Sequence, residues 1–386
     1  MPTPSIPRRA VLKGGMMAAG LGVLRLAGPA AAFPGVQDAE LVPWMDRPEP
    51  NPVPEAIVRQ LDWEALDSWI TPNDEFFVIK HFDWPALDEQ EWRLSVGGLV
   101  DRPMTLTLAD LRSRPRREEI VTLECSGNSA FPFNKGLVGN AAWAGTPLAA
   151  LLADAGVQDA GSEVVFWGAD AGEQTWRDVT VTEHFARSMS LADATSADNL
   201  LAYEMNGAPL PPEHGFPVRL IAPGWYGVAN VKWLTRIEVT DHRYAGHFMA
   251  RDYVTIREEE RDGETVWTFA TVGPGRLKSA PAKVTRQGDR YEVMGAAWGA
   301  PIAGVEVSID GEAWQPADLV ANDGGDFAWT FWTFDWGTPT PGEHTVASRA
   351  VAADGAIQPA PDDPLLADKA TFWEANGIIT RRVRVG

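Results

Sequence analysis

The chain has 386 residues, 45% of them hydrophobic and 22% charged, which predicts a soluble protein with two folded domains. Its 53 acidic side chains outnumber its 33 basic ones, and the net charge of −20 excludes nonspecific binding to nucleic acid or to an anionic membrane surface. A single cysteine excludes an internal disulfide, a cysteine-ligated iron–sulfur cluster, a thiolate zinc site and a haem attached through two cysteines. A redox cofactor would therefore be held by polar contacts and at most one sulfur.

Residues 1–32 have the features of a twin-arginine export signal. Arg8 and Arg9 precede an apolar run, and three alanines at 30–32 provide a cleavage site. The alternative, a membrane-anchoring helix, is disfavoured because the run is short and Arg25 interrupts it. We therefore expect a periplasmic mature protein without a membrane span. Loss of the leader's four basic residues would change the net charge from −20 to −24.

Four segments follow the leader. Residues 33–62 are rich in proline and predict an extended arm. Residues 63–245 alternate short strand-like and helix-like runs without a regular βαβ rhythm, which predicts an α+β domain. Residues 246–279 form a bridging segment. Residues 280–386 contain only short strand-like runs, typical of an immunoglobulin-like sandwich.

Individual elements can be assigned within the two larger segments. In the first, we expect strands over 92–96 and 119–123 and helices over 107–112 and 147–155. In the second, we expect strands over 290–295, 304–310, 327–334 and 344–350, with Asp310 and Gly311 in a hairpin turn. No internal repeat is present.

The segment 121–128 is the strongest candidate for chemistry and reads Val-Thr-Leu-Glu-Cys-Ser-Gly-Asn. An apolar strand delivers Cys125 into a turn of small residues, where backbone N–H groups allow a ligand to approach closely. From these residues alone, Cys125 is equally well explained as a buried strand-end cysteine or as a ligand.

This segment resembles the cysteine motif of the sulfite oxidase family of molybdopterin oxidoreductases, in which Cys125 would be the protein's thiolate ligand to molybdenum. Further similar segments follow in the family's order, at 71–77 with His81, 142–148, 202–207, 214–219, 223–227, 231–234, 295–298, 305–311 and 358–359. The resemblance extends from about Thr71 to the C-terminus. It implies a molybdopterin domain followed by an immunoglobulin-like dimerisation domain, a molybdenum–molybdopterin cofactor and a homodimer.

By motif position, the resemblance assigns cofactor contacts to Phe77, Val78, Ile79, Lys80, His81, Cys125, Asp170, His214, Arg219, Asn230, Val231 and Lys232. A thiolate suits molybdenum better than a nitrogen or oxygen ligand, and Arg219 and Lys232 suit a phosphate. Without the resemblance, each charged residue is also explained as a charge at the surface or core edge. The remaining histidines, His184, His242, His247 and His344, are interpreted as structural.

The family's reaction is oxygen-atom transfer, but the expected substrate contacts differ here. Animal and plant sulfite oxidases place two arginines and a tyrosine where this sequence has Ile79, Ala142 and Val179. Lys80 and Lys135 remain as candidate positive groups in catalysis. We therefore expect a pocket poor in cations, acting on sulfite or a related sulfur compound. Segments 223–225 and 376–378 are similar to bacterial sulfane dehydrogenases of the same family.

The sequence also indicates which partner proteins to expect. It has no haem attachment motif, so electrons would pass to a separate protein, a periplasmic c-type cytochrome. The tryptophans Trp298, Trp329, Trp332 and Trp336 exceed what a small core needs and favour a homodimer through the last segment. Two alternatives remain: a reductase of a sulfoxide or another oxo compound, and an inactive cofactor-binding protein. Intact Cys125 argues against the second.

Overall fold

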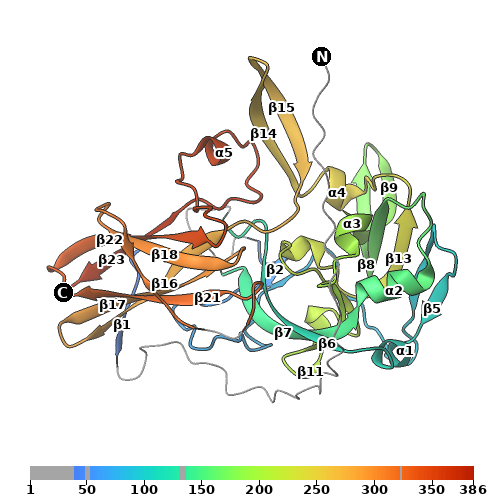
Figure 1. Ribbon diagram of the computed structural model, residues 1–386, viewed down its shortest axis with the longest axis horizontal. Helices are drawn as coiled ribbons and strands as arrows, with labels where there is room; N and C mark the ends of the chain where they lie inside the picture. Colours follow the sequence, from blue (N-terminus) through green and yellow to red (C-terminus); the bar gives the residue numbers. More distant parts are fainter. Residues whose placement is uncertain (1–38, 48–52, 130–135, 322–323) are drawn as a thin grey trace, which may run out of the picture. The chain divides into compact units, whose positions relative to one another are not determined.

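A computed structural model describes residues 39–47, 53–129, 136–321 and 324–386. The predicted leader and Lys135 lie outside these ranges. The described chain is mostly β, with few and short helices (Figure 1). The longest is α2 (Leu148–Ala155), so the helical share is smaller than an α+β prediction implies. Within the described ranges, no helix is both long and apolar enough to cross a bilayer.

Two sheets build the part of the chain up to Thr240. One has the order β5-β4-β13-β8-β9, and the other has the order β11-β10-β7-β6, with β12 also paired to β10. The first comprises β4 (Leu94–Gly98), β5 (Met104–Leu106), β8 (Glu163–Trp176), β9 (Val179–Ser190) and β13 (Leu234–Thr240). The second comprises β6 (Arg117–Glu124), β7 (Val138–Pro147), β10 (Leu200–Met205), β11 (Ala208–Pro209) and β12 (Arg219–Ile221). The strands expected over 92–96 and 119–123 are confirmed, within about two residues.

Short helices cover the first of these sheets. α1 (Leu108–Arg112) is capped by Thr107, whose hydroxyl accepts the amide of Asp110 at 3.1 Å while the Asp110 carboxylate accepts the amide of Thr107 at 2.8 Å. α2 ends at Gly156, which adopts a left-handed conformation. Leucines from both helices share one hydrophobic core with the inward side chains of β4, β8 and β13. Both predicted helices are therefore confirmed.

The C-terminal strands form two further sheets, in the orders β1-β16-β17-β21-β20 and β19-β18-β22-β23. Their members are β1 (Glu40–Val42), β16 (Lys278–Gln287), β17 (Arg290–Trp298), β18 (Ile302–Ile309), β19 (Gln315–Pro316), β20 (Asp318–Leu319), β21 (Thr330–Gly337), β22 (Gly342–Ala352) and β23 (Ile379–Val385). Valines of both sheets meet in one core around Trp332. All four expected strands are confirmed, and Asp310 and Gly311 both have positive φ in the turn after β18.

Within the proline-rich segment, β1 pairs with β16, and β2 (Ile57–Arg59) pairs with β3 (Val78–Ile79). One feature of the C-terminal half corrects the sequence analysis. The tryptophans Trp298, Trp329 and Trp332 are buried inside the protomer's own cores, and Trp336 packs against one of them. They are therefore core residues, and their number gives no support to a dimer.

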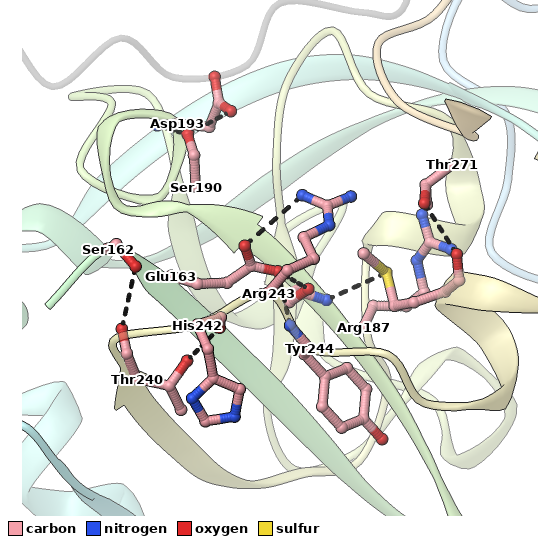
Figure 2. A network of polar contacts seen from close by, with 12 residues as sticks. Ser162, Glu163, Arg187, Ser190, Asp193, Thr240, His242, Arg243, Tyr244 and Thr271 are labelled. Carbon is pink, nitrogen blue, oxygen red and sulfur yellow. Dashed lines mark hydrogen bonds and ion pairs between the residues drawn. The ribbon is translucent and has the colours of Figure 1, made fainter. Parts of the chain in front are cut away.

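The bridging segment is more ordered than expected. It contains α4 (His247–Ala250) and a long hairpin of β14 (Val254–Arg261) and β15 (Glu264–Thr271). Polar side chains of β8 and β9 hold the residues just before this segment and its two ends (Figure 2): Glu163 accepts the amide of Tyr244 at 3.3 Å and lies 3.5 Å from the guanidinium of Arg243. Buried Arg187 donates to the carbonyls of Phe248 and Val272. These contacts position the residue between α4 and β14, Tyr253, described below.

Candidate active site

One pocket brings together side chains from seven separate stretches of the chain. Its empty space, part of which is open to solvent, is about 690 Å³. Its walls are Phe76, Phe77, Val78, Ile79, Lys80, His81, Leu123, Cys125, Asp170, Phe185, His214, Arg219, Gly227, Val228, Asn230, Lys232, Trp233 and Tyr253. The structure thus brings to one place all the predicted cofactor contacts except Val231, whose side chain is buried in the neighbouring core.

Cys125 lies at the first position after β6, in a short turn. Its amide donates to the carbonyl of Leu137 at 2.9 Å, and its carbonyl accepts the amide of Asn128 at 2.9 Å. Burial is the main cause that raises the pKa of the thiol to about 11, and the nearby Glu124 carboxylate adds to it. Without a metal the group is therefore a neutral thiol at neutral pH. Binding a metal would displace its proton.

A buried ion pair between Glu124 and Lys278 holds the turn that contains Cys125. Glu124 is 4% exposed and Lys278, from β16, is 1% exposed; the ammonium lies 2.6 Å from Oε1 of the carboxylate. The same carboxylate accepts Nδ2 of Asn128 at 2.9 Å and Nε1 of Trp298 at 2.9 Å. Three donors therefore hold the residue next to Cys125, two of them from the C-terminal half.

The pocket contains two cations that bond only to neutral groups, the buried Arg219 and the half-buried Lys232. Arg219 donates to the carbonyls of His214 and Asn230 at 3.0 and 3.1 Å, and Lys232 donates to those of Ile79 and Glu213 at 2.9 and 3.0 Å. Neither makes an ion pair within the described ranges. Burial lowers the pKa of Arg219 to about 9 and that of Lys232 to about 7. An anion bound here would reverse both shifts and relieve the cost of the unpaired charges.

Asp170 and His214 add polar groups to this part of the pocket. Asp170 is buried, its Oδ1 has no partner within the described chain, and burial raises its pKa to about 6. Nε2 of His214 lies 2.9 Å from the carbonyl of Asn73, and burial lowers its pKa to about 3, so the imidazole is neutral. Asp170 is thus an acceptor facing the cavity, available to a ligand that carries N–H groups.

A histidine–tyrosine pair also lines the pocket. Nε2 of His81 lies 2.6 Å from the hydroxyl of Tyr253, and the imidazole stacks on Phe185 with ring centres 4.6 Å apart. Burial lowers the pKa of His81 to about 3 and raises that of Tyr253. Both groups are therefore neutral hydrogen-bonding partners. No sequence signal pointed to Tyr253, which lies in the bridging segment.

Comparison with known proteins agrees with this arrangement. Residues 81–248 match the family of the oxidoreductase molybdopterin binding domain. Mitochondrial sulfite oxidase of Rattus norvegicus is 33% identical over 344 residues, covering 81% of this chain, which spans 60% of that protein. Sulfite oxidase of Gallus gallus is 31% identical, covering 81% of this chain and 72% of that protein. The chain belongs to the sulfite oxidase family.

A solved member of the family has the same fold. The crystal structure of the sulfane dehydrogenase SoxCD from Paracoccus pantotrophus superimposes with a TM-score of 0.74 and 28% identity, covering 90% of both chains. Family membership gives this protein a molybdenum–molybdopterin cofactor.

The pocket residues fit that cofactor. The orphaned Nε of Arg219 and the two unpaired cations suit a phosphate, while the unsatisfied Oδ1 of Asp170 suits the N–H edge of a pterin. Cys125 supplies a soft ligand on the same wall as Leu123. Asn230 contributes through its carbonyl, because its side chain is engaged with Ala222 and Tyr226.

The positions predicted to contact substrate are only partly where the sequence placed them. Ile79 lines the pocket, but Ala142 and Val179 do not. Val179 is 60% exposed at the start of β9, next to the β8–β9 turn, because that long hairpin carries it away from the core. It cannot occupy the position of a substrate-binding tyrosine. Lys80 lines the pocket, with its ammonium 2.5 Å from exposed Asp83.

Proposed function

We propose that this protein is an exported, periplasmic oxidoreductase that oxidises sulfite or a related sulfur compound. The observation that carries the proposal is the pocket itself, which combines one half-buried thiol with two cations, Arg219 and Lys232, that make no ion pair within the described residues. The names of the relatives, sulfite oxidase and sulfane dehydrogenase, support a sulfur substrate.

Each pocket residue has a separate task in this proposal. Cys125 is the ligand to molybdenum, Arg219 and Lys232 hold the phosphate, and Asp170 holds the pterin edge. When bound, the cofactor supplies oxygen-atom transfer and a two-electron change. The protein excludes water with its aromatic walls and holds neutral donors at His81 and Tyr253.

The substrate end of the pocket favours a neutral or singly charged sulfur compound over a dianion. The pocket lining includes the apolar side chains of Ile79, Phe185 and Val228, and the ammonium of Lys80 is already paired with Asp83. A dianion placed against apolar side chains keeps no compensating charge, which is costly. Tyr253 is the described phenol that could donate a hydrogen bond to an oxygen of the substrate.

Three further features belong to the same proposal. Electrons pass to a periplasmic c-type cytochrome. The two C-terminal sheets form an immunoglobulin-like domain, residues 280–386, behind a molybdopterin domain of residues 63–245. This second domain mediates a homodimer. The shared core of the two sheets supports the domain assignment.

The test is an anaerobic substrate panel on purified protein with a measured molybdenum content. The proposal expects about one molybdenum per chain and reduction of the metal centre by sulfite or a sulfur compound with a less charged head. Reoxidation by a sulfoxide, without reduction by any sulfur donor, would instead make the protein a reductase. Stoichiometric molybdenum with neither reaction would make it an inactive binding protein.

A further inference from the structure

We propose that an oxidised, basic one-electron carrier protein docks on a surface formed by the β14–β15 hairpin and residues 364–373. We call this surface the hairpin face and define it by four exposed side chains, Trp267, Phe269, Leu365 and Phe372. The inference rests on the proposed function, in which each turnover leaves two electrons on a single redox centre. Such electrons must leave one at a time when the acceptor takes only one.

The hairpin face is physically continuous with the turn that carries Cys125. The amide of Glu374 donates to the carbonyl of Ser126 at 2.9 Å. The rings of Phe372 and Trp373 lie directly over Gly127, where an added Cβ would be 3.3 and 3.2 Å from them. Phe372 is itself 50% exposed. A partner in contact with Phe372 would therefore be one side chain away from the cysteine turn.

A second series of ring contacts connects the hairpin face to the pocket. The rings of Phe372 and Trp373 are 4.2 Å apart, and those of Trp373 and Tyr253 are 4.4 Å apart. Tyr253 lines the pocket and contacts His81, with ring centres 5.5 Å apart. Electron transfer is favoured by short, bonded or contacting routes. Both routes from the pocket end at Phe372.

Exposed aromatic residues are concentrated at the hairpin face. Among the described residues, the exposed tryptophans and phenylalanines are Trp84, Trp267, Phe269 and Phe372. All but the first belong to this face, with Trp267 54% and Phe269 70% exposed. Ile256 connects them, because it is opposite Phe269 in the ladder and its amide donates to Thr371 Oγ1 at 3.0 Å. Exposed aromatics gathered in this way are typical of a protein interface.

The charge of the hairpin face determines the kind of partner. Residues 254–271 and 364–373 contain six acidic side chains and three basic ones. Two of the basic residues, Arg257 and Arg261, both pair with Glu259. Glu258 is opposite Trp267 in the ladder, so its carboxylate lies on the aromatic side of the hairpin. Acidic groups beside exposed aromatics fit a partner with a ring of lysines around an apolar centre.

The redox balance is complete with this partner. Oxidation of the sulfur substrate with water gives the oxygenated product, two protons and two electrons. Two molecules of the oxidised carrier each take one electron at the hairpin face, and the enzyme returns to its oxidised form. The protons leave to solvent.

The experiment uses a lysine-rich c-type cytochrome as the probe and ferricyanide as a small acceptor. In Trp267→Ala/Phe269→Ala, we expect the cytochrome kcat/KM at low ionic strength to fall about tenfold or more, as for truncated interface aromatics. The ferricyanide rate should stay within about twofold of wild type, since the pocket is unchanged. Glu258→Lys/Glu260→Lys should weaken the reaction with cytochrome and flatten its salt dependence. Matched controls are Trp84→Ala and Glu312→Lys, both exposed elsewhere.

Calorimetric titration of each variant with the oxidised cytochrome measures docking without turnover. The inference is wrong if the hairpin variants and the controls bind and reduce cytochrome equally well. It is also wrong if Trp267→Ala/Phe269→Ala converts a dimer to a monomer in sedimentation, because the face would then belong to a second copy of the chain. Absence of turnover with ferricyanide would overturn the proposed function instead, and the titration would still decide docking.

Discussion

Lys278→Met removes the ammonium that lies 2.6 Å from buried Glu124, and it tests whether the C-terminal half holds the cysteine turn in place. Methionine fills the same volume without the charge. The Glu124 carboxylate keeps its bonds to Asn128 and Trp298 at 2.9 Å but loses its counter-charge. Breaking a buried pair from one side typically costs about 3–5 kcal/mol, and the two remaining donors place this case near about 3 kcal/mol.

Thermal denaturation measures that loss. At roughly 2 °C per kcal/mol for a large chain, Lys278→Met should lower the melting temperature by about 6 °C. Glu124→Gln/Lys278→Met removes both charges and should recover a large part of the loss. Molybdenum content should fall in the single variant and recover in the double one, because the turn that presents Cys125 is displaced only when the carboxylate is unpaired.

Arg290→Met is the control for this experiment. Arg290 pairs with Asp335 at 2.5 Å, but both side chains are 63% exposed, and such pairs contribute about 0–1 kcal/mol. Lys278→Met melting at the temperature of this control would contradict a stabilising buried pair. A double variant less stable than Lys278→Met would contradict it as well, because the two charges would then not be acting as a pair.

Three further predictions concern the pocket. Arg219→Met should lower the molybdenum content of purified protein, since loss of one charge-assisted hydrogen bond costs about 1.5–3 kcal/mol; content equal to wild type would remove Arg219 from the phosphate site. In cofactor-free protein the pKa of Asp170 is raised to about 6. The contribution of this carboxyl to the free energy of unfolding is therefore fully present below about pH 4 and is lost as the pH rises through 6. Asp170→Asn should abolish that part of the pH dependence of the melting temperature, and an unchanged profile would contradict it. Ile79→Arg should lower the KM for sulfite about tenfold or more, whereas an unchanged KM would show that the pocket is not short of a cation.

The pocket could be predicted from the sequence because its residues occur in short motifs with little freedom of placement. Cys125 must follow β6, and Arg219 must begin β12, so strand pairing fixes both. Phe77 and His81 flank a two-residue strand, β3, that is held by β2. In such segments, recognising the motif also fixes where each residue lies relative to the strand. All the predicted cofactor contacts except Val231 therefore line one pocket, and their contact with a cofactor stays a prediction.

Residues outside these motifs could not be placed in the same way. Val179 was assigned by position in a long hairpin, and an error of a few residues there moves a side chain from the core to solvent. Tyr253 reaches the pocket because its backbone has a φ of 58° between α4 and β14, a conformation that no sequence pattern indicated. The four C-terminal tryptophans could not be placed either, because their number does not show whether they lie in a core or at an interface.

The proposed role of Cys125 as the ligand to molybdenum is tested most directly by comparing wild type with Cys125→Ser. Both proteins are assayed with the best substrate of the panel, with molybdenum content and melting temperature measured on the same samples. We expect Cys125→Ser to melt within a few degrees of wild type and to lose turnover, because the hydroxyl is a weaker donor than thiolate. Cys125→Ser turning over at the wild-type rate per molybdenum would contradict the account.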